Sequence, residues 1–280
     1  MATIVGGVGT SHVPAIANAL SRELWSDPYW QPFFAGYPPV RDWLTACRPD
    51  VAVVFYNDHG LNFFLDAMPT FAIGAADAYC TDDEGWGIGT VAPFRGDAAL
   101  SWHLIETAAA AGFDLTTCQE MRVDHGFWIP TALLWPERPP DLVVVPIHVN
   151  TVQHPLPTPA RCEAFGAAIG RGIRSWGEER RVVVIGSGGL SHQLEGQRAG
   201  FINRQFDVAC LDALASDDRS AITSHSIPEL VELAGSQGVE IINWVAMRGA
   251  IGGRVVEVHR NYHVPISNTA AGLLAMAPAG

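Results

Sequence analysis

The sequence predicts an α/β fold in which all 280 residues form a single domain. Short runs rich in Val and Ile show no alternation between apolar and polar residues, as expected of strands buried on both faces of a sheet. Segments with helical spacing separate these runs, and such alternation is typical of α/β proteins. The proline clusters at residues 136–140 and 155–159 are too short and too apolar to be interdomain linkers.

The first half of the chain begins with an expected strand, since residues 2–8 form an apolar run. Helical spacing covers residues 40–47, and the apolar run at residues 51–56 follows as the next strand. A short strand is expected at residues 70–74. Residues 75–96 carry an acidic, glycine-containing stretch and predict a long surface loop, which in a compact domain is often a lid or a binding loop.

The second half continues the alternation. The expected helices are residues 98–111, 158–176 and 203–215, and the expected strands are residues 142–149 and 181–186. Residues 226–248 have helical spacing that is interrupted near Gly235 and Gly238, so two helices are expected there. Residues 254–264 predict a last strand that ends at Pro265.

Composition excludes several classes of function. The formal net charge is −12, and the 17 Lys and Arg residues form no run, so we expect no nucleic-acid partner. No apolar run approaches the roughly 18 residues of a membrane span. The N-terminus also lacks the positive region of a signal peptide, so we expect a cytoplasmic protein without a membrane role. The five cysteines form no CxxC pair, which predicts reduced, buried thiols.

Two histidines follow expected strands directly. His59 comes after the run at residues 51–56, and His12 comes after the run at residues 2–8. Ligands of open α/β sheets bind beyond the carboxyl ends of strands, which favours a metal-binding role for both. Asn57 and Asp58 are then the expected hydrogen-bond partners of His59. The alternatives are that His59 binds its own loop backbone and that His12 simply opens a helix.

Glu240 stands in an apolar segment, residues 238–248, where a buried carboxylate without a partner would cost several kcal/mol. Arg248 lies about two helical turns away and is poorly placed to pair with it. A metal ion or another buried partner would resolve this cost. Two imidazoles and one carboxylate form the donor set that holds a mononuclear iron(II) with open coordination positions, so His12, His59 and Glu240 are candidate iron ligands.

Two further histidines are candidates for acid–base chemistry. His192 follows the strand expected at residues 181–186, beyond a glycine cluster that lacks the spacing of a phosphate-binding loop. His125 lies in an apparent turn, where a structural and a functional role are equally compatible with the sequence. His259 and His263 are four residues apart, but their surroundings predict a strand, so we expect no separate metal site there.

An ordered series of motifs resembles the class III extradiol ring-cleaving dioxygenases, the family of the catalytic (β) subunit of protocatechuate 4,5-dioxygenase. The resemblance runs from residue 2 to about residue 268. Its motifs are TSH at residues 10–12, YNDH at 56–59, DEGWG at 83–87, VDHG at 123–126, GGLSHQL at 188–194, RAGFIN at 198–203 and GVE at 238–240. RDW at residues 41–43, MRGA at 247–250 and YHVPISNT at 262–269 add to it.

The resemblance implies a fold and a role for each candidate residue. The implied fold is an α/β/α sandwich around a central mixed sheet. The implied roles are iron(II) ligands for His12, His59 and Glu240, acid–base catalysis for His192, and a position near substrate and oxygen for His125. Ser267 and Asn268 occupy the place where the family has groups near the carboxylate of the substrate.

The activity implied is ring cleavage of a carboxylated catechol, such as protocatechuate or gallate, by O₂. The product would be of the hydroxymuconate-semialdehyde type. An aminophenol or dihydroxypyridine substrate, a zinc hydrolase with the same ligands, and a non-enzymatic binding protein are the alternatives. The best-known relatives cover their active site with a small α subunit or a fused equivalent, and 280 residues leave no room for that domain. The expected partner is therefore either such a subunit or further copies of this chain.

Overall fold

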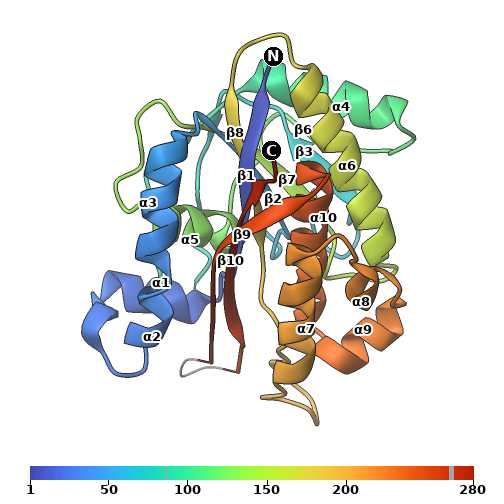
Figure 1. The fold of residues 1–280 in the computed structure, drawn as a ribbon. Helices are drawn as coiled ribbons and strands as arrows, with labels where there is room; N and C mark the ends of the chain where they lie inside the picture. The colour runs from blue at the N-terminus through green and yellow to red at the C-terminus, as the bar shows by residue number, and fades with distance from the viewer. Residues whose placement is uncertain (86, 265–267) are drawn as a thin grey trace.

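The computed structural model describes residues 1–85, 87–264 and 268–280. Within these residues, ten strands form one mixed sheet that is flanked by helices (Figure 1). The strands are β1 (Thr3–Thr10), β2 (Val51–Tyr56), β3 (Phe71–Gly74), β4 (Ala78–Tyr79), β5 (Phe94–Gly96), β6 (Thr116–Cys118), β7 (Val143–Val149), β8 (Arg181–Ser187), β9 (Val255–His263) and β10 (Ala271–Pro278). The helices are α1 (Pro14–Ser21), α2 (Gln31–Phe34), α3 (Tyr37–Cys47), α4 (Ala98–Ala110), α5 (His125–Leu134), α6 (Pro159–Ser175), α7 (Arg204–Ala215), α8 (Ser220–Thr223), α9 (Ile227–Ala234) and α10 (Ile241–Ile251), with 3₁₀ turns η1 (Leu24–Ser26) and η2 (Gly238–Glu240).

The middle of the sheet is parallel. β7, β2, β8 and β1 are neighbours in that order, and each adjacent pair is parallel. Parallel neighbours need long crossover connections, which the helices between these strands supply. β10 and then β9 extend the sheet beyond β1 as antiparallel strands. The α/β fold with a mixed sheet covered on both sides is therefore as predicted.

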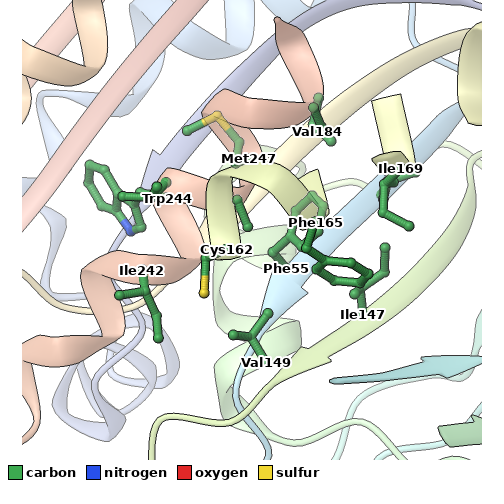
Figure 2. Packing of buried hydrophobic residues seen from close by; sticks show 14 of the residues in the cluster. Phe55, Ile147, Val149, Cys162, Phe165, Ile169, Val184, Ile242, Trp244 and Met247 are labelled. Carbon is green, nitrogen blue, oxygen red and sulfur yellow. The ribbon is translucent and has the colours of Figure 1, made fainter. Parts of the chain in front are cut away.

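The two faces of the sheet build separate cores. Val53 and Phe55 of β2 point into the core formed with α4, α6 and α10, while Val54 and Tyr56 point into the core formed with α1, α3 and α5. Figure 2 shows Phe55 in the first core beside Phe165 of α6, with their ring centroids 6.1 Å apart. Full burial of such a side chain stabilises the fold by about 1.5–3 kcal/mol, so β2 is held from both sides.

Some elements differ from the predictions. β10 was missed because its Ala, Gly, Leu and Met residues have little intrinsic strand preference, and its pairing with β1 and β9 decides its conformation. α5 was missed because Pro130 interrupts its helical pattern. The loop expected at residues 75–96 contains the short strands β4 and β5. No helix in the described part of the chain has the length and apolar character needed to cross a bilayer.

The cysteines are free thiols, as predicted. Cys162 and Cys210 are buried in the core. Cys47 and Cys118 are only partly buried and Cys80 is exposed, so the predicted burial is wrong for these three residues, most clearly for Cys80. It lies in the loop between β4 and β5, whose irregular sequence gave no sign of which positions face solvent.

The fold brings the carboxyl ends of three parallel strands to one edge of the sheet. Thr10 at the end of β1 lies opposite Ser187 at the end of β8. β2, which ends at Tyr56, pairs with β8 on one side and β7 on the other. The segments that follow these strands therefore emerge together, as predicted for a ligand site of an open α/β sheet.

Candidate metal centre and active site

His12 follows β1 and is almost completely buried. Its Nδ1 lies 2.8 Å from the Ser187 hydroxyl oxygen. That hydroxyl donates its single proton to the Gly126 carbonyl, so its oxygen accepts a hydrogen bond from His12 Nδ1–H. The neutral His12 ring therefore carries its lone pair on Nε2, which lies 3.5 Å from Oε2 of Glu240.

His59 lies in the loop after β2, and its side chain is 23% exposed. Its Nδ1 is 2.9 Å from Asp124 Oδ2, and the same oxygen accepts from the His59 backbone N–H at 2.7 Å. Burial alone would raise the pKa of Asp124, but the adjacent His59 lowers it to about 2. Because this ionised carboxylate can only accept, it fixes a proton on His59 Nδ1. Burial lowers the pKa of His59, but Asp124 and Glu240 outweigh that effect and raise the pKa to about 10, so a bound metal ion would take the place of the second proton, on Nε2.

Glu240 ends the η2 turn that precedes α10 and is 6% exposed. Its Oε1 accepts a hydrogen bond from Asn57 Nδ2 at 3.1 Å, and its Oε2 accepts one from the Gly189 backbone N–H at 2.9 Å. Oε1 also lies 3.6 Å from His59 Nε2. Burial would raise the pKa of Glu240, but its contacts with His12 and His59 outweigh that effect and hold the pKa well below its usual range. The carboxylate is therefore ionised.

Glu240 lies beside both histidines and approaches each of them with a different oxygen. Ligand atoms bound at about 2.1 Å and about 90–110° apart lie roughly 3.0–3.4 Å from each other. The nitrogen–oxygen separations of 3.5 and 3.6 Å from Glu240 to His12 and His59 are close to that spacing. Arg248 does not pair with Glu240, as predicted, because its guanidinium donates to the carbonyls of Leu214 and Gly253. A His–His–carboxylate set suits a divalent transition metal.

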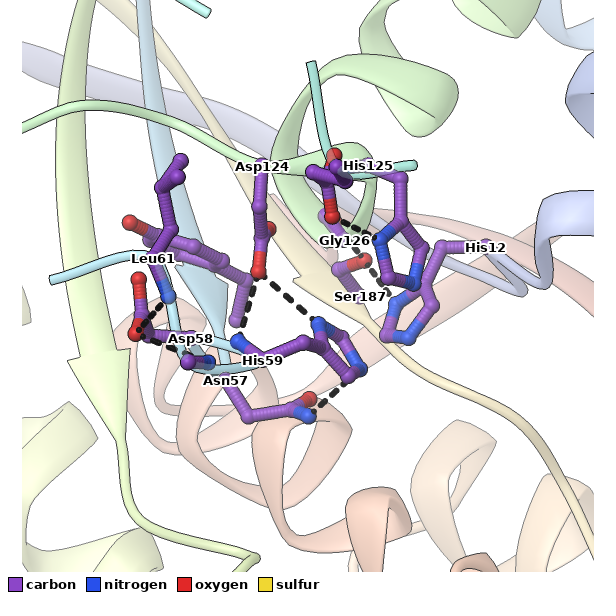
Figure 3. A network of polar contacts seen from close by, with 12 residues as sticks. His12, Asn57, Asp58, His59, Leu61, Asp124, His125, Gly126 and Ser187 are labelled. Carbon is purple, nitrogen blue, oxygen red and sulfur yellow. Dashed lines mark hydrogen bonds and ion pairs between the residues drawn. The ribbon is translucent and has the colours of Figure 1, made fainter. Parts of the chain in front are cut away.

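His125 is the first residue of α5 and joins the same cluster, as Figure 3 shows. Its ring centroid lies 4.1 Å from that of His59 and 5.5 Å from that of His12. His12, His59 and His125 each offer a ring nitrogen within 4.8 Å of the others, so His125 could also contribute a nitrogen to a metal. Burial and the neighbouring His59 lower the pKa of His125.

His192 lies beyond β8 and is 3% exposed. Its Nδ1 is 2.9 Å from the Leu190 carbonyl oxygen, which can only accept, so the proton is on Nδ1 and the lone pair of the neutral ring is on Nε2. Burial lowers the pKa of His192 despite the opposing charge of Glu240. His192 is therefore neutral at pH 7 and can act as a base.

The glycine cluster after β8 allows this close packing. A Cβ on Gly188 would lie 2.7 Å from Cβ of Glu240, and a Cβ on Gly189 would lie 2.5 Å from Cε1 of His192. Gly188 also has a φ of +150°, which other residues rarely adopt. The absence of these two side chains lets the backbone approach Glu240 and His192 closely.

Of the two remaining candidates, Asn268 and Ser267, the structure describes Asn268. Asn268 is exposed, and its neighbour Thr269 forms an isolated antiparallel bridge with His192. Asn268 therefore lies one residue from a segment that is joined to the candidate base. Ser267 lies outside the described residues.

Three residues of the site had no predicted role there: Asp124, Ser187 and Glu84. Asp58, predicted to support His59, does something else: its carboxylate accepts from backbone N–H groups of residues 60–63 and so shapes the loop. Asn57 does contact His59, with Nδ2 2.9 Å from Nε2, as predicted. The available signal for Asp124 was its position next to His125.

Together, the fold and the cluster define an α/β protein with a buried histidine–carboxylate site that could hold a transition-metal ion. A family model described as the catalytic LigB subunit of aromatic ring-opening dioxygenase matches residues 6–273. The chain belongs to this family, and the resemblance to extradiol dioxygenases of class III is confirmed.

Characterised relatives agree with this family. The chain is 36% identical over 193 residues to a gallate dioxygenase of Pseudomonas putida, an alignment that covers 69% of this chain and 56% of that protein. It is 31% identical over 256 residues to a 2,3-dihydroxyphenylpropionate/2,3-dihydroxicinnamic acid 1,2-dioxygenase of Cupriavidus necator, covering 76% of this chain and 79% of that protein. The chain thus spans little more than half the length of the first relative.

A solved structure shares the fold. An uncharacterized protein from Escherichia coli K12 superimposes with a TM-score of 0.61 at 14% identity, covering 97% of this chain and 99% of that chain. This likeness shows that the architecture is an established one.

Proposed function

We propose that this chain is an iron(II)-dependent extradiol dioxygenase that cleaves the ring of a carboxylated catechol with O₂. Family membership supports ring opening as the reaction class. Two of its relatives are named for gallate and for 2,3-dihydroxyphenylpropionate, each an aromatic compound with adjacent ring hydroxyls and a carboxylate. The expected product of a protocatechuate- or gallate-like substrate is a hydroxymuconate-semialdehyde derivative that contains both oxygen atoms of O₂.

The observation that carries the proposal is the convergence of His12 Nε2, His59 Nε2 and the Glu240 carboxylate. Each nitrogen lies within 3.6 Å of a Glu240 oxygen, and a metal ion bound here would replace the proton that His59 Nε2 carries without it. Glu240 is the better third ligand than His125, because its negative charge lies between the two imidazoles and would offset the charge of the cation. The three residues would occupy one side of iron(II) and leave the other side open.

Iron(II) would supply the affinity for the two diol oxygens and the redox chemistry that O₂ requires. The chain itself supplies proton transfer. His192 holds its own proton on Nδ1 through Leu190, so Nε2 is available to take the proton of a diol hydroxyl and return it later in the reaction. Its lowered pKa keeps it in the base form at neutral pH.

His125 would act beside the substrate. It is 3% exposed and lies against His59, so a hydrogen bond from or to its ring would act in a site largely shielded from water. Ser267 and Asn268 remain the proposed contacts of the substrate carboxylate. The separate small α subunit and the homo-oligomer remain alternative partners, which the mass of the purified particle by light scattering would distinguish.

The test is anaerobic loading of the full chain with iron(II), followed by air and a panel of protocatechuate, gallate, 3-O-methylgallate, 2,3-dihydroxyphenylpropionate, plain catechol and 2-aminophenol. We expect one O₂ consumed per ring and a yellow ring-opened product from at least one carboxylated diol, and no turnover by His59→Ala. Absence of O₂ uptake with every diol would overturn the proposal. Turnover of 2-aminophenol alone would replace the substrate class, and zinc-supported anaerobic hydrolysis would favour a hydrolase.

A further inference from the structure

Glu84 makes a paired contact with His125 from a distant loop. Its Oε1 accepts from the His125 backbone N–H at 2.7 Å, and its Oε2 lies 2.5 Å from His125 Nδ1. The Glu84 side chain is 7% exposed. Its neighbours Asp83 and Gly85 are exposed, so Glu84 is the position at which this loop turns inward.

The contact fixes two properties of His125. An ionised carboxylate only accepts hydrogen bonds, so the shared proton belongs to His125 Nδ1 and the lone pair of the neutral ring is on Nε2. The backbone contact also satisfies an N–H at the first turn of α5, whose N-cap residue Asp124 makes no side-chain capping bond. A carboxylate there is further favoured by the helix dipole.

Two hydrogen bonds hold the base of the loop that carries Glu84. Val91 N–H donates to the Thr81 hydroxyl at 3.0 Å, which joins the two ends of the loop. Val123 N–H donates to the Cys80 carbonyl at 2.9 Å, which ties the base of the loop to the segment before His125. The position of Glu84 and the orientation of His125 are therefore mechanically linked.

We propose that Glu84 is a positioning residue that holds His125 as the Nδ1–H tautomer and directs its Nε2 to the metal site. The part of this inference that concerns catalysis rests on the proposed function, whereas the part that concerns the tautomer does not. Glu84 acts through His125, since the hydrogen bonds of its side chain within the described chain go to the backbone and the ring of that residue.

The kinetic test is a double-mutant cycle of Glu84→Gln and His125→Ala in the iron-loaded full chain. A Gln side chain at position 84 would offer one carbonyl oxygen and one NH₂ group to two N–H donors of His125, the backbone N–H and Nδ1–H. It therefore cannot keep both hydrogen bonds unless the proton of the His125 ring moves from Nδ1 to Nε2. We expect Glu84→Gln to lower kcat about 10–100-fold, as loss of an orienting partner does, with KM and iron content little changed. In the His125→Ala background the same change should have almost no effect. Asp83→Asn removes the same charge from the adjacent exposed position and should match the wild type.

The tautomer is read independently by long-range ¹H–¹⁵N correlation spectra of the full chain, as purified and loaded with zinc(II). His125 should give the Nδ1–H pattern in the wild type and in Asp83→Asn, and the Nε2–H pattern in Glu84→Gln. An unchanged tautomer in Glu84→Gln, or an equal loss of kcat in both backgrounds of the cycle, would overturn the inference. If no diol is turned over at all, the proposed function fails, while the spectra still decide whether Glu84 holds His125.

Discussion

Replacing Asp124 with Asn should weaken metal binding without disturbing the fold of the site. One oxygen of Asp124, Oδ2, accepts both the backbone N–H and the Nδ1–H of His59, at 2.7 and 2.9 Å. An amide oxygen in the same place can accept both bonds, so the geometry of His59 survives. The substitution therefore removes the negative charge behind the ligand and replaces Oδ1, a buried atom without a hydrogen-bond partner in the described chain, by an amide nitrogen.

The size of the effect follows from those two bonds. A hydrogen bond to a charged acceptor contributes about 1.5–3 kcal/mol and a neutral one about 0.5–1.5 kcal/mol, so two bonds that lose their charge cost about 1–3 kcal/mol together. Part of that loss falls on the basicity of His59 Nε2. The expected result is an iron(II) dissociation constant raised about 10–100-fold, the usual range for partners of metal-bound histidines.

The assay is anaerobic competition for iron(II) against a chromophoric chelator, with urea unfolding as the measure of stability. Asp207→Asn is the matched control, because the Asp207 carboxylate is as buried as that of Asp124. Its hydrogen-bond donors are Ser191 and Tyr262, neither of which is a candidate metal ligand. We expect Asp207→Asn to lower stability and leave the iron(II) affinity within about threefold of wild type. Wild-type affinity in Asp124→Asn, or equal losses of affinity in both variants, would refute the assigned role of Asp124.

Three further predictions concern other parts of the molecule. His59→Ala and Glu240→Ala should each abolish stoichiometric iron binding, whereas His125→Ala should keep it and lose turnover; loss of iron in His125→Ala would make His125 a ligand. Ser267→Ala should raise KM for carboxylated diols far more than for plain catechol, and equal effects would remove Ser267 from the carboxylate site. Burial lowers the pKa of His148 from 6.5 to about 4. Between these two pH values, His148 is therefore protonated in the unfolded chain and neutral in the folded chain. The free energy of unfolding should therefore fall by about 2 kcal/mol from this residue between pH 7 and pH 5. Urea titrations of His148→Gln should lack that part of the decrease, and an identical pH dependence in both proteins would contradict the argument.

The fold was predictable where local sequence and tertiary structure agree. β2 was predicted with its observed bounds because a strand buried on both faces is a continuous apolar run. The interruption between α9 and α10 was predictable from its glycines, and Gly235 indeed has a φ of +89°. β10 was not, since its conformation depends on partners far away in the sequence. The same contrast holds for the site.

The candidate ligands were predictable because each carries a local sign. His12 and His59 follow strands, and Glu240 is an acid in an apolar segment. For Asp124 the available sign was its position next to His125, and for Glu84 it was its place in the DEGWG motif; neither sign predicts that the acid is buried. Asp124 is 65 residues from its partner His59, and Glu84 is 41 residues from His125. The burial of Glu240 can be inferred because the apolar residues next to it in the sequence predict a buried segment. The contacts of Asp124 and Glu84 depend on residues far away in the sequence, so their burial cannot be inferred in the same way.

The hydrogen bonds of the four site histidines in the described chain share one feature that no single motif contains. Each ring is held at Nδ1 by an acceptor from another residue: a hydroxyl, two carboxylates and a carbonyl, from Ser187, Asp124, Glu84 and Leu190. In every ring the second nitrogen, Nε2, is therefore the one that a cation or a substrate proton would use. We expect a site built in this way to offer these nitrogens to a cation and to acidic hydroxyl protons; at His59 the Asn57 amide also lies 2.9 Å from Nε2 and would have to give way to a cation. Under the proposed function, metal binding and proton abstraction would both depend on these acceptors at Nδ1, and the three side-chain acceptors, from Ser187, Asp124 and Glu84, can each be removed by substitution.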